Sequence, residues 1–234
     1  MAAQHEAIPS VLSCIMDNDT ISMMLNSLRN KYELDYLTLI DKDKIIQTRF
    51  SQFDSLDNSY RMDPIIEQAL SWKAMRGTLL LSQRDLKREN SELLDNAFIS
   101  LVSTDRARPT DQLAETRGMV LEAAVPIMGP DDTILGALYG GILLNRKHTL
   151  VDDIRKTVFG EETYEGKPLG TVTIFLWDVR IATNVIKINS TKAIGTRVSD
   201  EVYLIVLEQG ERFGDRSFVV NDCYLSAYDP IRDP

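Results

Sequence analysis

AAVPIMGP, residues 123–130, occurs a second time as AYDPIRDP at residues 227–234, and this repeat decides the fold. The first copy continues into an apolar run at residues 133–144, whereas the second copy ends where such a run would begin. Each copy follows a strand–turn–strand pattern, at residues 36–48 and 173–183. The spacing predicts two tandem copies of one α+β module, the second without its last strand, and not a short-period solenoid.

The composition is that of a globular protein with an acidic surface. The 234 residues are 44% hydrophobic and 26% charged, and the formal net charge is −9. Such an acidic balance argues against nucleic acid and anionic membrane surfaces as direct partners. The sequence contains neither an apolar run of roughly 18–20 residues, as a transmembrane helix needs, nor a signal-peptide pattern. We therefore expect either a cytoplasmic protein or a soluble region of a longer membrane protein.

The first half of the chain begins with an amphipathic helix and continues as a mixed module. Apolar residues recur at helical spacing over residues 10–33, which predicts a helix that packs on its own domain or also forms a dimer interface. Asp63 and Pro64 are typical of a helix start, so we predict a helix from 64 to about 75. The other predicted elements are a hairpin at 34–40 and 45–50, a charged helix at 84–94, strands at 97–102, 118–127 and 133–144, and a connecting helix at 148–159.

The second half repeats the same order without a final strand. Strands are predicted at 171–177 and 179–185, and later at 217–221 and 224–231. Between them, Ser199 as N-cap and Gly210 as stop bound a helix. The predicted domains are a helix at 1–33, a first module at 34–146, a connecting helix and linker at 147–164, and a second module at 165–234. The order β-β-α-β-β-β is that of PAS-like folds.

No residue pattern indicates catalysis. The chain has two histidines, His5 and His148, and two cysteines, which we interpret as independent thiols. No triad, HExxH motif or metal-ligand spacing is present. The glycines within 133–144 lie inside a predicted strand, where glycine marks a close backbone approach and not a phosphate loop. We predict no enzyme activity, no metal and no cofactor.

Several stretches resemble one family of sensor domains. Gly118–Ile127, Gly136–Arg146 and Leu150–Asp152 resemble the end of a membrane-distal Cache module. The matching parts of the membrane-proximal module are residues 170–175, 178–185, 193–199 and 219–231. The chain is similar to tandem (double) Cache domains in which a Cache 3 and a Cache 2 module are fused. It departs from the pattern at Cys223, where an aromatic residue is usual, and in its missing last strand.

The resemblance implies an extracytoplasmic sensor of a prokaryotic histidine kinase or chemoreceptor. Such a region is held by flanking transmembrane helices, dimerises in the receptor, binds a small carboxylate or amino acid and signals to a cytoplasmic output domain. The alternative interpretation is a cytoplasmic PAS/GAF-like regulatory domain or a non-catalytic enzyme subunit. Hydrophobic segments on both sides of this region in the full gene would favour the sensor.

The candidate ligand-binding residues lie in both modules. A carboxylate is best held by a guanidinium next to an aromatic wall. In the first module we expect Trp72 and Arg76 to share one helical face, and the ligand residues are predicted to be Tyr60, Arg61, Trp72, Arg76, Glu122 and Tyr139. Either Arg180 or Arg197 is expected to form an ion pair that locks the second sheet. The residues of a second site, or of that structural lock, are Asp178, Arg180, Arg197, Asn221, Tyr224 and Tyr228.

Overall fold

The computed structural model describes residues 18–49, 60–61, 63–164, 166–187, 190–220 and 222–233. The chain divides into two compact units. The first unit comprises Met1–Asp95, Gly118–Leu143 and Asp233–Pro234, and the second unit comprises Asn96–Arg117 and Leu144–Arg232. The chain therefore enters the second unit twice. Within the described residues, no helix combines the length and apolar character needed to span a membrane.

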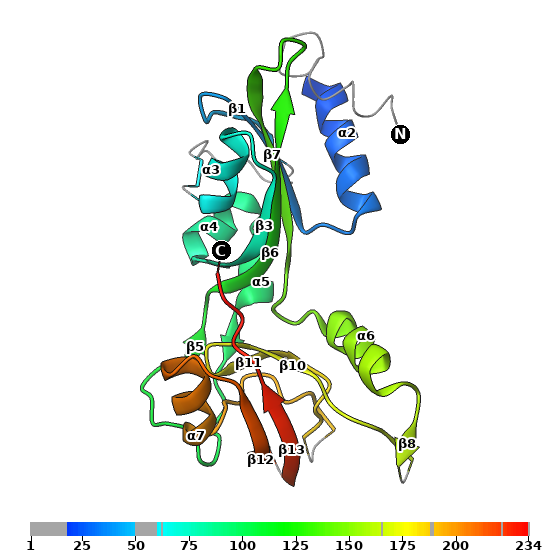
Figure 1. The fold of residues 1–234 in the computed structure, drawn as a ribbon, viewed down its shortest axis with the longest axis vertical. Helices are drawn as coiled ribbons and strands as arrows, with labels where there is room; N and C mark the ends of the chain where they lie inside the picture. Colours follow the sequence, from blue (N-terminus) through cyan, green and yellow to red (C-terminus); the bar gives the residue numbers. More distant parts are fainter. Residues whose placement is uncertain are drawn as a thin grey trace. The chain divides into compact units, whose positions relative to one another are not determined.

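The first unit is built on an antiparallel sheet of five strands in the order β2-β1-β7-β6-β3 (Figure 1). Its strands are β1 (Tyr36–Asp41), β2 (Ile46–Arg49), β3 (Met75–Leu81), β6 (Gly118–Met128) and β7 (Ile134–Leu143). The predicted hairpin and the two long strands are thus confirmed. Strand β7 lies in the centre because it pairs with both β1 and β6.

Helices cover both faces of this sheet (Figure 1). Helix α2 (Asn18–Lys31) packs Ile21 and Leu25 against Leu37 and Leu39 of β1. Because side chains alternate along a strand, Tyr36 and Thr38 point to the opposite face. Helix α3 (Pro64–Leu70) packs on β3, β6 and β7, and α4 (Gln83–Glu89) packs on β1 and β3. The predicted helix at 10–33 is confirmed over α2, and its first part lies outside the described residues.

Two predicted helices are shorter than expected. Asp63 caps α3 as predicted, accepting hydrogen bonds from the backbone of Ile65 and Ile66, but α3 ends at Leu70. The chain turns at Trp72, whose φ is +74°, and strand β3 follows from Met75. The predicted helix at 84–94 is divided into α4 and α5 (Glu92–Ala97), because Asn90 has an extended backbone.

The second unit is built on two hairpins. Strand β10 (Thr173–Leu176) pairs with β11 (Val179–Thr183), and β12 (Phe213–Val219) pairs with β13 (Asp222–Tyr228). Among the described residues, no strand joins the two hairpins. In the first unit β7 has that place, between β1 and β6. This is the arrangement expected of a second module without its last strand, and the descent of both units from one module stays a prediction.

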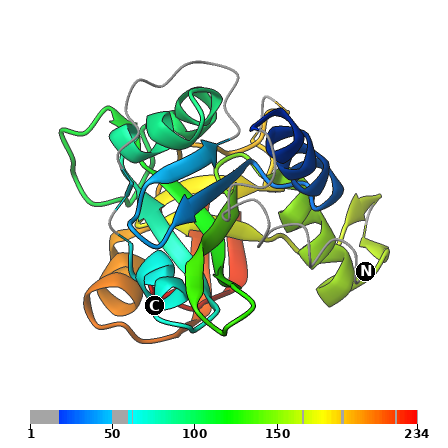
Figure 2. The same cartoon turned by 90° about the horizontal axis from the view of Figure 1, so that it is seen from above.

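Helix α6 (His148–Phe159) has the predicted bounds, and the short strands of the unit are β4 (Ile99–Ser100), β5 (Ala114–Glu115), β8 (Thr163–Tyr164) and β9 (Lys167–Pro168). Ser199 caps α7 (Asp200–Val202) as predicted, and the helix continues as a π-helix, η1 (Tyr203–Glu208). Seen from above, helix α6 and the β8–β9 hairpin lie apart from α7, which is drawn in orange (Figure 2).

The segment 96–117 belongs to the second unit, although the sequence placed it within the first module. The backbone N–H of Val102 donates to Gly195 (2.9 Å), and the N–H of Asp200 donates to Arg106 (2.8 Å). The Arg108 guanidinium forms ion pairs with Asp200 (2.8 Å) and Glu208 (2.5 Å). These contacts join the segment to the residues before and within α7 and η1. Its polar composition gave no sign of them.

Gly141 makes room for a buried tyrosine, as predicted for a glycine inside a strand. A Cβ at Gly141 would lie 2.5 Å from the Leu121 carbonyl oxygen and 2.6 Å from the Tyr36 hydroxyl. We therefore expect Gly141→Ala to lower the free energy of unfolding by about 1–3 kcal/mol. Gly214→Ala is the matched control, since a Cβ there meets no atom within 4 Å. Urea unfolding of both variants checks this, and equal stabilities would contradict it.

Candidate functional site

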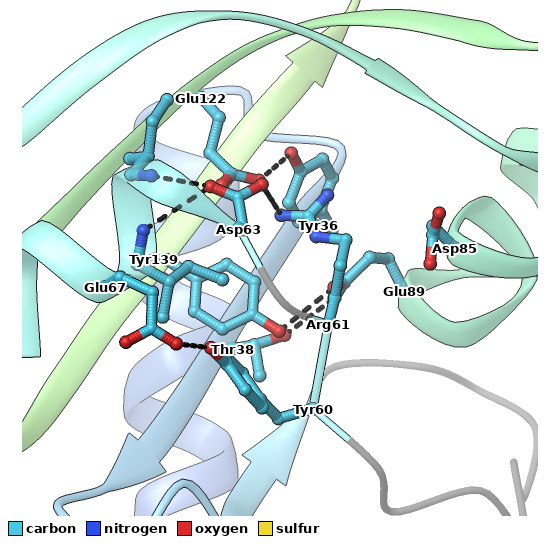
Figure 3. A network of polar contacts seen from close by, with 12 residues as sticks. Tyr36, Thr38, Tyr60, Arg61, Asp63, Glu67, Asp85, Glu89, Glu122 and Tyr139 are labelled. Carbon is cyan, nitrogen blue, oxygen red and sulfur yellow. Dashed lines mark hydrogen bonds and ion pairs between the residues drawn. The ribbon is translucent and has the colours of Figure 1, made fainter. Parts of the chain in front are cut away.

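The first unit contains a buried polar cluster on the sheet face opposite α2 (Figure 3). At its centre, Oε2 of Glu122 accepts hydrogen bonds from the Tyr36 hydroxyl (2.5 Å) and from the Arg61 guanidinium. The Glu122 side chain is 0% exposed. Asp63, the cap of α3, lies 3.4 Å from the same guanidinium group. Strands β1 and β6 and the residues before α3 thus all contribute to the cluster.

A second carboxylate extends the cluster. Glu89 at the end of α4 accepts hydrogen bonds from Thr38 and Tyr139, both at 3.0 Å. Arg49 Nε lies 3.4 Å from Glu89, and the Arg61 guanidinium lies 5.7 Å from the centre of the Tyr139 ring. Two guanidinium groups and three carboxyl groups are therefore buried together, which requires mutual compensation.

The buried charges of this cluster compensate each other only in part. Burial raises the pKa of Glu122 to about 7, and the nearby Arg61 guanidinium opposes this only in part. Burial, together with the charge of Glu122, raises the pKa of Tyr36 well above its usual value. Arg61 Nε and Nη1 and Glu122 Oε1 are buried without a hydrogen-bond partner. The cluster thus holds buried donors and a buried acceptor without hydrogen-bond partners.

The structure brings four of the six predicted ligand residues into this region. Arg61, Glu122 and Tyr139 belong to the cluster itself. Tyr60 stands at its edge, where its hydroxyl bonds to Glu67 and Lys44 lies 5.3 Å from its ring centre. The members that the sequence did not indicate are Tyr36, Thr38, Arg49, Asp63 and Glu89. The sequence signal that could have indicated Tyr36 and Thr38 was their spacing, because two polar residues two positions apart on β1 share one face of the sheet.

Trp72 and Arg76 do not join the cluster, and the prediction that they share a helical face is wrong. Trp72 follows α3 and is 58% exposed. Arg76 lies on β3 opposite Ala123, whereas its neighbour Gly77 lies opposite Glu122. Arg76 therefore points to the other face of the sheet, and it is exposed. The early end of α3 is the physical reason.

The two arginines predicted for the second unit, Arg180 and Arg197, differ in their partners among the described residues. Arg197 forms the predicted ion pair with Asp178, with Nε 2.7 Å and Nη2 2.5 Å from one carboxylate oxygen. Its remaining Nη1 donates to the Arg108 carbonyl at 2.5 Å. Arg197 thus connects the β10–β11 turn to the segment 96–117. The predicted ion pair is thus the one of Arg197, and its role in locking the sheet stays a prediction.

Arg180 has no such partner among the described residues. It lies on β11, is 3% exposed, and has Nε and Nη1 buried without a hydrogen bond. Its guanidinium lies 5.1 Å from the centre of the Phe175 ring. Burial lowers its pKa to about 10, with a small opposing effect of Tyr228. A buried guanidinium with free donors has the chemistry to bind an anion.

The other predicted residues of this unit have different surroundings. Tyr228 packs on Phe175 and Phe213, with ring centres 5.9 and 5.8 Å apart. Tyr224 is 43% exposed, and Asn221 lies outside the described residues. In the described part of the chain, no three His, Cys, Asp or Glu side chains gather in a way that could hold a metal ion.

Comparison with known proteins gives one match to a family model. The model described as single cache domain 3 matches residues 142–234, which is less than half of the chain and lies almost entirely within the second unit. No curated protein matches the chain.

Three solved structures of sensor proteins show a loose similarity. They are the Escherichia coli DcuS sensor domain (12% identity, 54% of this chain and 68% of that chain covered, TM-score 0.32), the periplasmic domain of Vibrio cholerae LuxQ (15%, 93% and 82%, 0.40), and a domain of a sensory box/GGDEF family protein from Vibrio parahaemolyticus (17%, 63% and 55%, 0.31). What the comparisons establish is local: residues 142–234 are similar to a single cache domain 3.

Proposed function

We propose that this chain is the extracytoplasmic ligand-sensing region of a transmembrane receptor and that its second unit binds a small carboxylate at Arg180. The observation that carries the proposal is the 3% exposed guanidinium of Arg180, which has no charged or hydrogen-bonded partner among the described residues. Burying a charge without a partner is costly, so a fold that keeps one gains from an anion that completes it. The match of residues 142–234 to a cache model supports the sensing role.

Arg180→Met tests the site directly. We expect wild-type protein to be stabilised against heat by millimolar acetate, propionate or butyrate, because a ligand that binds only the folded state raises its stability. The variant should bind at least about tenfold more weakly, since the carboxylate would be buried without a partner. Arg212→Met is the control, because Arg212 is 82% exposed. Equal thermal shifts in all three proteins would contradict the proposal.

The cluster in the first unit is the second candidate site. Its support is the pair of unused groups, Arg61 Nη1 and Glu122 Oε1, which together suit a ligand with both an acceptor and a donor, such as an amino acid. A carboxylate bound at Arg61 would compete with Glu122, so its affinity would rise as Glu122 takes up a proton. Calorimetry of glycine and alanine at pH 6 and pH 8 tests this site.

The receptor context rests on the predicted tandem Cache architecture. In that architecture the chain is flanked by transmembrane helices, dimerises, and passes a shift of its strands to a kinase or chemotaxis output domain. A ligand shifts such an equilibrium only through different affinities for the two states. Hydrophobic segments before residue 1 and after residue 234 in the full gene would support this context, and a full-length protein found in the cytoplasm would refute it.

A further inference from the structure

We infer that the site at Arg180 selects monocarboxylates with an apolar body over di- and tricarboxylates. This inference rests on the proposed function and adds the chemical class of the ligand. Two observations carry it: the charge available around Arg180, and the side chains that surround its guanidinium.

The site offers a ligand one positive charge, that of the Arg180 guanidinium. Asp178, the acid nearest in sequence, is occupied by Arg197, whose Nε lies 2.7 Å from it. No ion pair or hydrogen bond of the Arg180 side chain occurs within the described residues. Of the titratable groups described, Tyr228 is the one whose charge affects Arg180. One anionic group therefore neutralises the site, and a second would be buried without a cation.

The surroundings are aromatic and aliphatic. Phe175 and Arg180 face each other across β10 and β11, and Phe213 and Tyr228 face each other across β12 and β13. Because cross-strand partners share a sheet face, each hairpin presents one such pair. The ring centres of Phe175 and Tyr228 lie 5.9 Å apart. The two hairpin faces that carry these rings therefore face the same interior of the second unit.

Aliphatic side chains complete this interior. Val202 and Val206, from α7 and η1, pack in one core cluster with Phe213. Phe175 and Tyr228 lie against the same cluster. The Tyr228 hydroxyl lies 3.5 Å from the hydroxyl of buried Ser217, and both are uncharged groups that can donate to a carboxylate. Apolar ligand carbon would be buried here favourably, and a second charge would not.

Calorimetry with a matched set of small molecules tests the selectivity. The set is acetate, propionate, butyrate and isovalerate as monocarboxylates, succinate and citrate as polyanions, and isobutyramide as an uncharged control. We expect affinity to rise about fourfold for each added CH₂ group that becomes buried. Butyrate and isovalerate should bind more than tenfold tighter than succinate or citrate, and isobutyramide should not bind measurably.

Arg180→Met and Arg212→Met separate the possible failures. Loss of butyrate binding in Arg180→Met alone supports the inference. Tighter binding of succinate or citrate that depends on Arg180 overturns the selectivity and leaves the carboxylate site of the proposed function standing. Binding of none of the acids, or binding unchanged in Arg180→Met, overturns the site and the selectivity together.

Discussion

Replacing Arg197 by methionine is expected to lower the free energy of unfolding of the second unit by about 3–5 kcal/mol. Arg197 and Asp178 are each 10% exposed, and removing the guanidinium leaves the carboxylate in the interior without its cation. The variant also loses the hydrogen bond to the Arg108 carbonyl. The segment 96–117 would therefore loosen with the β10–β11 turn.

The two tryptophans allow each unit to be followed separately. Trp177 lies in the β10–β11 turn of the second unit, and Trp72 lies in the first unit. Urea unfolding in a Trp72→Phe background, followed by Trp177 fluorescence, measures the effect. An Arg197→Met variant as stable as the parent would contradict the prediction.

Arg180→Met in the same background is the informative comparison. It removes a guanidinium of similar burial that has no carboxylate partner, so the second unit should keep or gain stability without ligand. The exposed Arg212→Met should change little, because exposed ion pairs contribute only about 0–1 kcal/mol. A stability loss in Arg180→Met as large as that in Arg197→Met would mean that Arg180 is structural.

Local signals in the sequence predicted much of the framework. Asp63-Pro64 and Ser199 are helix caps in the structure as predicted, and α6 has its predicted bounds. These elements depend on neighbouring residues alone. Strand β3 was missed because its apolar residues, 79–81, are consecutive and do not alternate. Arg76 lies on this strand, and it was therefore wrongly predicted to lie on a helix.

Both candidate sites depend on contacts between residues that are distant in sequence. The partners of their charged side chains could therefore not be predicted from the sequence. The sequence indicated that Arg180 or Arg197 pairs with an acid, but both lie within 20 residues of Asp178, at 2 and 19 positions. Only the fold of the 193–199 loop onto β11 decides that Arg197 takes the pair. Likewise Glu122 was predicted as a ligand residue without named partners, and the structure gives it Arg61 and Tyr36.

Glu122 is expected to make the stability of the first unit depend on pH near neutrality. Its ordinary pKa is 4.5, and burial, opposed by Arg61 and assisted by Asp63, raises the pKa in the fold to about 7. A raised carboxyl pKa means that the folded state holds the proton more tightly than the unfolded state. This contribution to stability is fully present below pH 4.5 and is lost as the pH rises through 7. The difference amounts to about 3 kcal/mol.

Glu122→Gln isolates this contribution, because glutamine has the shape of the protonated acid and does not titrate. In a Trp177→Phe background, with Trp72 as reporter, both proteins should unfold alike at pH 4. At pH 8 the glutamine variant should be more stable by about 3 kcal/mol. Parallel pH profiles would show that Glu122 stays ionised throughout.

Glu67→Gln supplies a control of opposite sign. Hydrogen bonds from Lys44 and Tyr60 lower the pKa of Glu67, so its contribution is present above pH 4.5 and is lost as the pH falls. This variant should therefore be less stable than the parent at pH 8 and should approach it in acid. A general effect of removing any glutamate would give both variants the same sign. The predicted crossing of the two profiles depends on the burial of Glu122 beside Tyr36 and Arg61, because Glu67 is 38% exposed and Glu122 is not exposed at all.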